Sequence, residues 1–399
     1  MKTVLNYLML FFAAATIGNV NGQEKLIKKA DKLFNSYAYV EAADVYKKIL
    51  KSKEEHSSME VLKKLGDCYY YNSNLKDASV WYKRLWKKKN DQDSLYAQRE
   101  QSGQIVSDQE LASAFVEPVY YFRTAQTLRH LEEYDNADAY MIKLKALGEE
   151  DSRIQKLVDN PNYFDEITKQ SGRYIIKPIP QNSIGVDFAP SYYLSSRIVF
   201  SSSRTNKITK LRSKWNEQPY LDLYRFTVRD NDSSFSYPLK FSNAVNSVYH
   251  ESTSTFSKDG LTMYFTRNNL KKATLKRDSS GTSNLKIYKS QYDREKSKWS
   301  KPEELPFNGE DFSTAHPVLS ADGFTMYFAS DRPGGYGMSD LYEVEVRSDG
   351  SFGEPKNMGD WINTEGRDTF PFVTKSDKLY FASDGHLGLG GLDLSLIHI

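Results

Sequence analysis

The sequence predicts a multidomain chain in which α-helical repeats are followed by an all-β propeller with four recognisable blades. Two repeated patterns and one change of composition support this prediction. A column pattern of small and bulky residues recurs in the first part of the chain, as in stacked helix pairs. From Gly172 onward, short alternating runs replace it, and the phrase S-x-D-G-x-T-M-Y-F occurs twice. The predicted segments are an export signal at 1–22, helical repeats at 23–150, a helical connector at 151–172 and a propeller at 173–399.

The composition fits a folded chain that recognises its partners locally. Of the 399 residues, 39 % are hydrophobic and 14 % aromatic, which is too apolar for a disordered chain. The 54 basic and 52 acidic residues leave a net charge of +2, so no global field attracts nucleic acid or an anionic membrane. The single cysteine, Cys68, excludes an intramolecular disulfide and a zinc site built on C-x-x-C.

The N-terminus reads as a cleavable export signal. Lys2 precedes an apolar stretch from Val4 to Ile17, and cleavage is expected after Gly22. The stretch is shorter than the roughly 20 apolar residues that a bilayer crossing needs. No cysteine stands at the cleavage point to carry a lipid. We therefore expect an exported chain with no transmembrane span once the signal is removed.

The helical repeats rest on four aligned columns of residues. A small residue is followed after twelve positions by alanine, then by a bulky residue and an aliphatic one. In the three copies the columns are Ala30, Gly66 and Ala125; Ala42, Ala78 and Ala137; Tyr46, Tyr82 and Met141; and Ile49, Leu85 and Leu144. Small residues at such places allow helices to pack closely. The array predicts either a concave face that binds a protein or a helical spacer that positions its neighbour. The insert at 89–113 is predicted to be a long loop or an irregular helix.

The β half divides into four units, each aligned on the phenylalanine of a core strand. These phenylalanines are Phe200, Phe265, Phe328 and Phe381, and Pro190, Ser254, Pro317 and Pro371 open the strands before them. Asp259-Gly260 and Asp322-Gly323 predict hairpin turns, because glycine accepts the positive φ of a tight reversal. A third strand follows in each unit and an outer fourth element in three of them. Such sheets stack around an axis as propeller blades.

Three further expectations concern packing and the ends of the propeller. Tyr264, Tyr327 and Tyr380 are interpreted as core or inter-blade packing residues. Tyr174–Ile179 is predicted to be an N-terminal strand that closes the propeller by covering an open edge. The final residues, from about Ser395, depart from the blade pattern and are expected to be a truncated or artefactual end.

A search for chemistry gives no catalytic residue, cofactor or metal. The motifs H-E-x-x-H, G-x-S-x-G and G-x-x-x-x-G-K-[ST] are missing from the sequence, and its six histidines are scattered. The glycine-rich segments 334–337 and 388–391 precede strands, which favours turns over phosphate loops. Charged residues recur at the exit of the inner hairpins, where they form inter-blade bonds or bind a partner. The candidate partner-binding residues are Arg204, Arg267, Arg332, Asp331 and Asp384.

The repeats resemble known families. L-G-D-C-Y-Y-Y-N-S-N-L-K-D-A-S-V-W-Y and A-Q-T-L-R-H-L-E-E-Y-D-N-A-D-A-Y resemble tetratricopeptide repeats, and M-Y-F-A-S-D-R resembles the TolB-like, WD-type (WD40-like) propeller repeat. Together, behind a signal peptide, they resemble OmpA-family envelope proteins of Bacteroidetes, including PorE-like components of type IX secretion. The family's peptidoglycan-binding OmpA-like domain has no counterpart in this sequence, so peptidoglycan contact is not expected of it.

The resemblance implies a non-enzymatic scaffold in the periplasm, associated with the outer membrane. It would bind protein partners through the helical repeats and the propeller face, in secretion, gliding or envelope integrity. Two alternatives remain open: a hydrolase-like propeller enzyme with its site at the channel mouth, and a glycan- or peptidoglycan-binding module. Carboxylates and a histidine converging on the channel would favour the enzyme, whereas serine, threonine and arginine would favour the scaffold.

Overall fold

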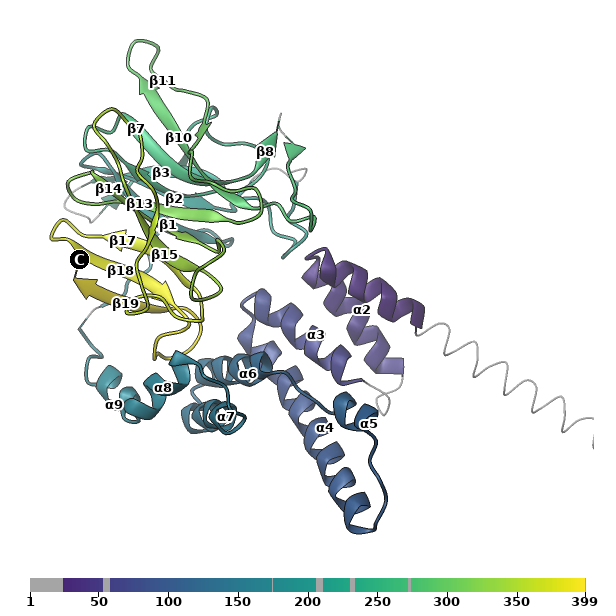
Figure 1. The fold of residues 1–399 in the computed structure, drawn as a ribbon. Coiled ribbons are helices and arrows are strands. Elements are labelled where there is room, and N and C mark those ends of the chain that lie inside the picture. Colours follow the sequence, from purple (N-terminus) through teal and green to yellow (C-terminus); the bar gives the residue numbers. More distant parts are fainter. Residues whose placement is uncertain are drawn as a thin grey trace, which may run out of the picture. The chain divides into compact units, whose positions relative to one another are not determined.

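The protein combines a helical part with four antiparallel sheets in a propeller-like arrangement (Figure 1). The computed structural model describes residues 24–52, 58–173, 175–205, 211–229, 234–271 and 274–398. The predicted export signal at 1–22 lies outside them. The chain forms two compact units. The helical unit runs to Glu149 and also includes Lys214–Glu217, and the β unit contains Glu150–Ser213 and Gln218–Ile399.

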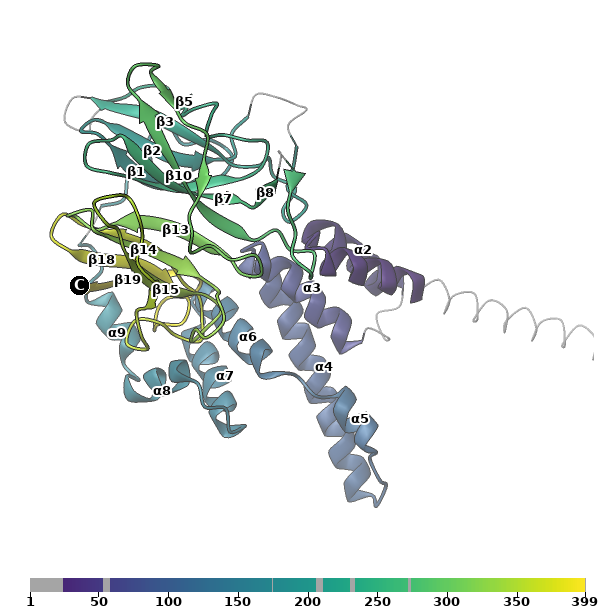
Figure 2. The ribbon, with the colours of Figure 1, turned by 45° about the horizontal axis from the view of Figure 1, so that its top comes forward.

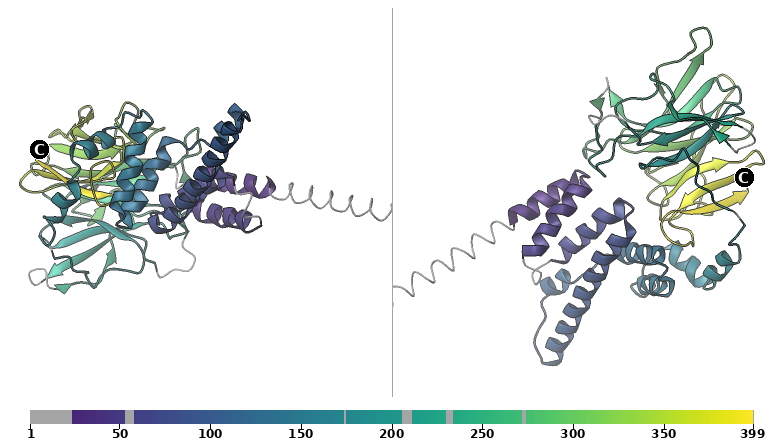
Figure 3. Two further views of the ribbon diagram at one scale, coloured as in Figure 1. Left: turned by 90° about the horizontal axis from the view of Figure 1, so that it is seen from below. Right: turned by 180° about the vertical axis from the view of Figure 1, so that it is seen from behind.

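The helical unit consists of helices that follow one another as packed pairs. Residues 24–35 are helical, and then come α2 (Tyr39–Ser52), α3 (Met59–Tyr71), α4 (Leu75–Gln101), α5 (Asp108–Ser113), α6 (Pro118–His130) and α7 (Tyr134–Ala146). Helices α2, α3 and α4 lie side by side, in purple and dark blue (Figure 3). The insert is largely helical, because α4 continues to Gln101 and a capping box of Ser107 and Glu110 starts α5.

The aligned columns form the core of this unit. Ala30, Ala42, Ala78 and Ala137 are fully buried, and so are Tyr46 and Tyr82. A Cβ atom on Gly66 would lie 2.3 Å from Cε1 of Tyr82, so only glycine lets α3 and α4 approach this closely. Each of the two tyrosines also has its own aspartate partner, fifteen residues earlier in the sequence. Tyr46 donates to Asp31 (2.6 Å) and Tyr82 to Asp67 (2.8 Å), which satisfies buried hydroxyl groups.

The β unit contains four sheets, here called blades one to four. Blade one has β1 (Asp187–Tyr193), β2 (Arg197–Ser202), β3 (Asp222–Arg229), β4 (Ser234–Phe235) and β5 (Leu239–Lys240); blade two has β6 (Glu251–Phe256), β7 (Thr262–Asn268), β10 (Leu285–Asp293), β11 (Lys298–Trp299) and β12 (Glu303–Glu304). Blade three has β13 (Thr314–Leu319), β14 (Thr325–Ser330), β15 (Asp340–Glu345) and β16 (Lys356–Asn357); blade four has β17 (Asp368–Val373), β18 (Lys378–Ser383) and β19 (Asp393–His398). A small ribbon, β8 (Leu270–Lys271) with β9 (Thr274–Leu275), stands apart.

The first strands of the blades lie next to one another. Strand β6 contacts both β1 and β13, and β13 contacts β17. In Figure 2, β13 of blade three lies between β7 and β10 of blade two and the yellow strands of blade four. Each first strand is interrupted by a bulge, at which one residue has positive φ: Ala189, Thr253, His316 and Phe370. The prediction that the next residues, Pro190, Ser254, Pro317 and Pro371, open these strands is wrong. The strands begin three residues earlier, at Asp187, Glu251, Thr314 and Asp368. Because positive φ is costly for these side chains, the packing around the four bulges must over-determine them.

Several predictions of the blade pattern are confirmed. Asp259-Gly260 connects β6 to β7 and Asp322-Gly323 connects β13 to β14, with φ of +67° and +87° at the glycines. Met326 and Phe328 are buried in a cluster that also contains Tyr264 from the preceding blade. The prediction of inter-blade packing therefore holds for Tyr264. The glycine-rich segments are turns that lead into β15 and β19.

The predicted closing strand is wrong for its described residues. Residues 175–179 belong to no strand, Ile175 and Ile176 are 84 % and 93 % exposed, and Tyr174 lies outside the described residues. Ile179 packs instead against Phe200 and its neighbours in blade one. The prediction rested on a likeness of this segment to the outer strands of the blades, but such a likeness does not supply a pairing edge.

Two short helices, α8 (Ser152–Asp159) and α9 (Tyr163–Thr168), belong to the β unit. They lie within the predicted connector. Ile154, Leu157 and Tyr163 are buried. The N-terminus of α8 is fixed by Glu365, which accepts hydrogen bonds from the backbone N–H (2.8 Å) and the hydroxyl of Ser152. A carboxylate at this helix terminus also suits the positive end of the helix dipole.

Candidate functional site

Two of the candidate arginines lie over aromatic rings at equivalent positions of their own blades. The rings are the phenylalanine of the second strand and a tyrosine of the third strand. The guanidinium of Arg204 lies 4.9 Å from the ring centre of Phe200 and 5.4 Å from that of Tyr224. Its Nε donates to Ser202 Oγ (2.9 Å), and an ion pair joins it to Asp187 (2.9 Å). These contacts fix the side chain within blade one.

Arg332 repeats this arrangement in blade three. Its guanidinium lies 5.4 Å from Phe328 and 4.9 Å from Tyr342, and its Nε donates to Ser330 Oγ (3.3 Å). Instead of an ion pair, a hydrogen bond reaches the backbone oxygen of Phe307 (3.1 Å). Burial lowers the pKa of Arg332, because less water is left to solvate its charge.

Arg267 reaches the corresponding tyrosine of blade two from a different position. It stands two residues after Phe265, whereas Arg204 and Arg332 stand four residues after their phenylalanines. Its guanidinium lies 5.7 Å from the ring centre of Tyr288, and its Nε is 3.0 Å from the buried carboxylate of Glu251. Burial raises the pKa of Glu251 to about 7, while a hydrogen bond from Ser247 and the charge of Arg267 oppose that shift.

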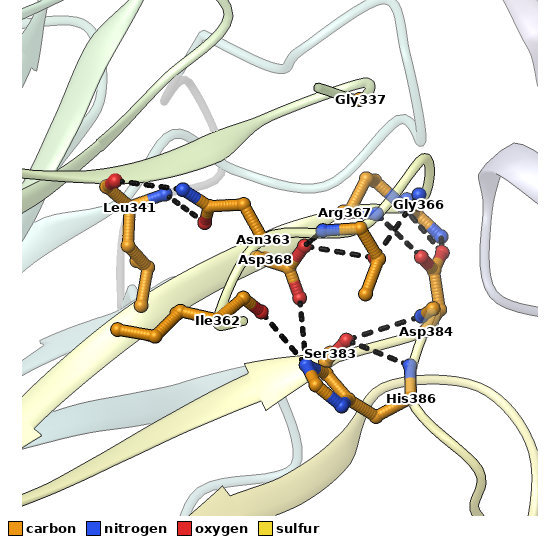
Figure 4. A network of polar contacts seen from close by, with 12 residues as sticks. Gly337, Leu341, Ile362, Asn363, Gly366, Arg367, Asp368, Ser383, Asp384 and His386 are labelled. Atoms are coloured by element: carbon orange, nitrogen blue, oxygen red, sulfur yellow. Dashed lines mark hydrogen bonds and ion pairs between the residues drawn. The ribbon is translucent and has the colours of Figure 1, made fainter. Parts of the chain in front are cut away.

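The two candidate aspartates accept backbone hydrogen bonds. Asp331 accepts from the N–H of Ser313, and burial raises the pKa of its carboxyl group. Asp384 is buried and accepts from the backbone N–H (2.6 Å) and Nε (2.8 Å) of Arg367 (Figure 4). All five candidates thus have intramolecular partners, and partner binding through them stays a prediction.

Blade four contains a denser polar network around Asp368 (Figure 4). Its Oδ2 accepts from the backbone N–H (2.7 Å) and the hydroxyl (2.8 Å) of Thr364, and Nε2 of His386 lies 4.0 Å from Oδ1. His386 Nε2 also lies 2.7 Å from the backbone oxygen of Ile362. Burial raises the pKa of Asp368 and lowers that of His386 and of nearby Lys156. The network therefore favours a neutral imidazole.

A buried charged residue at the start of the third strand pairs with the outer strand, and its sign is reversed in blade two. In blade one, Asp222 is paired with Lys240 (2.9 Å). In blade two the same position is Lys286, which pairs with Glu304 (2.6 Å) and Glu310 (2.8 Å). In blade three, Asp340 accepts from the amide of Asn357 (2.7 Å), and Asp393 starts the third strand of blade four. We did not predict this column, although the aligned phrases L-D-L-Y and L-K-I-Y display it.

A second recurrent feature, also missed from the sequence, is an asparagine that bonds both backbone groups of a third-strand residue. Asn246 accepts from the N–H of Leu223 (2.8 Å) and donates to its carbonyl (3.0 Å). The same two bonds join Asn308 to Ile287, and Asn363 to Leu341 (Figure 4). In each case an apolar residue, Val245, Phe307 or Ile362, precedes the asparagine, and this is the available sequence signal.

The bulges of the first strands bring a threonine and a histidine together. Oγ1 of Thr253 lies 2.7 Å from Nδ1 of His316 and 3.2 Å from the hydroxyl oxygen of Thr266. That hydroxyl oxygen of Thr266 also accepts a hydrogen bond from the backbone N–H of His316 (2.8 Å). The imidazole stacks on Phe370 with 3.9 Å between ring centres. Burial lowers the pKa of His316 to about 3, so the ring is neutral. Thr253 and His316 are thus linked directly, and also through the hydroxyl group of Thr266.

The helical unit contains an aromatic cradle, formed by Tyr37, Tyr39 and Tyr71, that holds the indole of Trp215. The ring of Trp215 lies parallel to Tyr37 (5.9 Å, 7°) and perpendicular to Tyr39 (4.9 Å, 88°). Its Nε1 donates to the backbone oxygen of Tyr71 (3.1 Å), whose ring lies 6.3 Å away. Trp215 belongs to the four residues 214–217 of this unit that lie between β2 and β3 in the sequence.

The cradle is supported by a buried ion pair. Arg123 contacts Asp67 (2.6 Å) and donates to the hydroxyl of Tyr71 (2.7 Å). Asp67 also accepts from Tyr82 (2.8 Å) and Tyr120 (3.1 Å). Burial raises the pKa of Asp67, and the charge of Arg123 opposes this. Arg123 thus holds Tyr71 by its hydroxyl, whereas Trp215 bonds its backbone oxygen.

The described residues show neither a membrane helix nor a metal centre. None of their helices has the length and apolarity that crossing a bilayer demands. Likewise, no three or more His, Cys, Asp or Glu side chains in this part of the chain are placed to hold a metal ion.

No model of a known protein family matches the chain, and no curated protein matches it. Among solved structures, TolB from Acinetobacter baumannii is 16 % identical, with a TM-score of 0.30 over 54 % of this chain and 41 % of TolB. An α-L-arabinofuranosidase from Lactobacillus brevis is 12 % identical (TM-score 0.33; 51 % and 63 %), and a puromycin-hydrolyzing peptidase of Mycobacterium tuberculosis is 10 % identical (0.29; 53 % and 29 %). The chain spans less than two thirds of each of them. Likenesses this distant assign neither a function nor a partner.

Proposed function

We propose that the protein is a non-enzymatic scaffold that holds protein partners through its helical unit and its propeller. The observation that carries this proposal is the aromatic cradle, which already holds a tryptophan side chain from a distant stretch of the sequence. Tyrosine rings in a fixed arrangement offer a large contact area at low entropic cost, and protein-binding surfaces are enriched in them.

The finer assignment rests on sequence patterns. The buried small residues and Gly66 support tetratricopeptide-like helix pairs, and such arrays bind proteins. The signal-like N-terminus supports export to the periplasm. The resemblance to OmpA-family proteins adds outer-membrane association and a role in secretion, gliding or envelope integrity.

A propeller enzyme is the second candidate, and the pair formed by Thr253 and His316 favours it. A hydroxyl 2.7 Å from a neutral imidazole has the geometry of a nucleophile with its base. Hydrolases of this type usually add a carboxylate that orients the imidazole. Here Nδ1 of His316, the atom that such a carboxylate would engage, is taken by the threonine itself. The scaffold is therefore the better-supported proposal.

The two candidates are separated by one experiment on the mature chain and its His316→Asn variant. Asparagine tolerates the positive φ of this bulge, so the fold should survive. Crosslinked cells are used for affinity capture, and the purified chains are assayed on peptide and glycoside substrates. The scaffold predicts one specific set of envelope proteins with both chains. Hydrolysis by the wild type alone, without captured partners, would replace it by the enzyme.

A further inference from the structure

Trp215 stands at the tip of a short hairpin. Residues Arg212 and Pro219 pair as an antiparallel bridge, and Ser213 N donates to Gln218 O (2.9 Å). Glu217 has φ of +57°, as tight turns require. The tip, Lys214–Glu217, belongs to the helical unit. The indole that lies in the cradle thus comes from a turn and not from a helix or a long strand.

The cradle recognises an indole by more than its apolar surface. The ring of Tyr37 is parallel to the indole and the ring of Tyr39 is perpendicular to it. The carbonyl of Tyr71 accepts the indole N–H at 3.1 Å, a bond that phenylalanine or leucine could not make. Stacking, an edge contact and a directed hydrogen bond together define a tryptophan site.

The cradle does not depend on Trp215 for its shape. Tyr39 is buried and also packs on Phe34 and Tyr71 (5.3 and 5.0 Å). Tyr71 is held through its hydroxyl by Arg123. Tyr37 takes its position from a turn in which its own φ is +59°. Because these residues are already held in place, the free energy needed to reorganise the cradle on binding or release of an occupant is small.

Trp215 itself is only partly enclosed, since 39 % of its surface remains exposed. It is held as the tip of a hairpin, so its release would open the cradle without unfolding a helix or a blade. An occupant in the same chain competes with any external one, and for short tethers its effective concentration is of millimolar order.

We propose that the hairpin at 211–220 is an internal ligand of the cradle, and that the external partner presents a tryptophan at the tip of an exposed turn. This inference rests on the proposed function, because it names the class of protein segment that the helical unit binds. Partner binding then requires displacement of Trp215, which keeps the free protein in a low-affinity state.

The test uses the full mature chain and a fluorescent synthetic peptide, LRSKWNEQPY, which copies residues 211–220. Fluorescence polarisation compares the wild type with Trp215→Ala. If a freed cradle binds the peptide with Kd near ~0.1 mM and the tether supplies ~1 mM, removal of Trp215 tightens peptide binding about tenfold. Trp361→Ala is the matched control, since Trp361 is an exposed tryptophan of the β unit, and it should bind like the wild type.

A double variant, Trp215→Ala with Tyr37→Asn, locates the binding site. Asparagine suits the positive φ of this position but removes the stacking ring, so peptide binding should be lost while circular dichroism stays unchanged. Equal peptide affinity for the wild type and Trp215→Ala, or undiminished binding to the folded double variant, overturns the inference. Capture of envelope partners by that double variant would still support the scaffold and would place its binding site elsewhere.

Discussion

Blades one and two have the same strand order, yet the buried charge at the start of the third strand is negative in blade one and positive in blade two. Blade one buries Asp222 and places Lys240 on the outer strand, while blade two buries Lys286 and places Glu304 there. Both buried side chains are 1 % exposed, and their partners are 50 % and 42 % exposed. The position therefore accepts a buried charge of either sign when the outer strand carries the opposite charge.

The same two blades treat the acid at the start of the first strand differently. Asp187 is partly buried, which alone would raise its pKa, but hydrogen bonds from Ser202, Ser183 and Arg204 outweigh burial and lower it. Glu251 is more deeply buried and has fewer donors, so its pKa rises to about 7. The comparison shows that the depth of burial and the donors around the carboxyl group together set the direction of the shift.

The largest effect is expected from Lys286→Asp, which gives blade two the acid of blade one without its basic partner. Three carboxylates would then converge, and stability should fall by about 3–5 kcal/mol. Adding Glu304→Lys recreates the pair of blade one and should restore more than half of the loss. Urea unfolding of the full chain measures both. A double variant no more stable than the single one would contradict the equivalence of the two pairs.

The next effect is a pH dependence carried by Glu251. Its carboxyl group keeps a proton that the unfolded chain releases above the ordinary pKa of 4.5. Stability is therefore fully present below pH 4.5 and falls, by about 3 kcal/mol, as pH rises through about 7. Glu251→Gln should remove this fall, as seen in unfolding curves between these pH values.

Asp187→Asn is the matched control for that experiment. The lowered pKa of Asp187 predicts the opposite sign: stability that is present above the ordinary value of 3.8 and lost as pH falls through the folded value. The variant should lose stability at neutral pH and approach the wild type in acid. Parallel profiles for the Glu251 and Asp187 variants would refute the contrast between the blades.

A smaller effect, equal in both blades, is expected from the asparagines. Asn246→Ala and Asn308→Ala each leave a backbone N–H and C=O of the third strand without their side-chain partner. Each should cost about 2 kcal/mol. Chemical denaturation of the two variants, side by side, checks this. Losses that differ by more than about 1 kcal/mol would mean that the two bonds are not interchangeable between blades.

The smallest effect is expected from Lys240→Met. The lysine is half exposed, so water already screens its ion pair, and methionine keeps much of the side-chain length. The loss should be about 1 kcal/mol, and salt titration of the wild-type unfolding transition should reproduce part of it. A loss as large as that of Lys286→Asp would show that Asp222 depends on Lys240 alone.

The periodic features of this fold were predictable from the sequence. Burial fixes the spacing of Ala42 and Ala78 in the helices, and tight reversals fix Asp-Gly in the hairpins. The Asn246 bonds and the Trp215 cradle were not predicted, because they join residues far apart in sequence through single side chains. The bulge at His316 was hidden by Pro317, since a residue before proline ordinarily continues a strand.

The alternating charge of Asp222 and Lys286 also bears on how repeated blades find their own strands during folding. Blades one and two have the same strand order, so an outer strand that paired with the third strand of the other blade would meet the wrong charge. Asp222 against Glu304 would bring two carboxylates together, and Lys286 against Lys240 two ammonium groups. Each mispaired sheet would contain one pair of like charges, whereas each correct sheet pairs opposite charges at this position. A sign reversal in a single column thus disfavours an exchange of outer strands between these two blades.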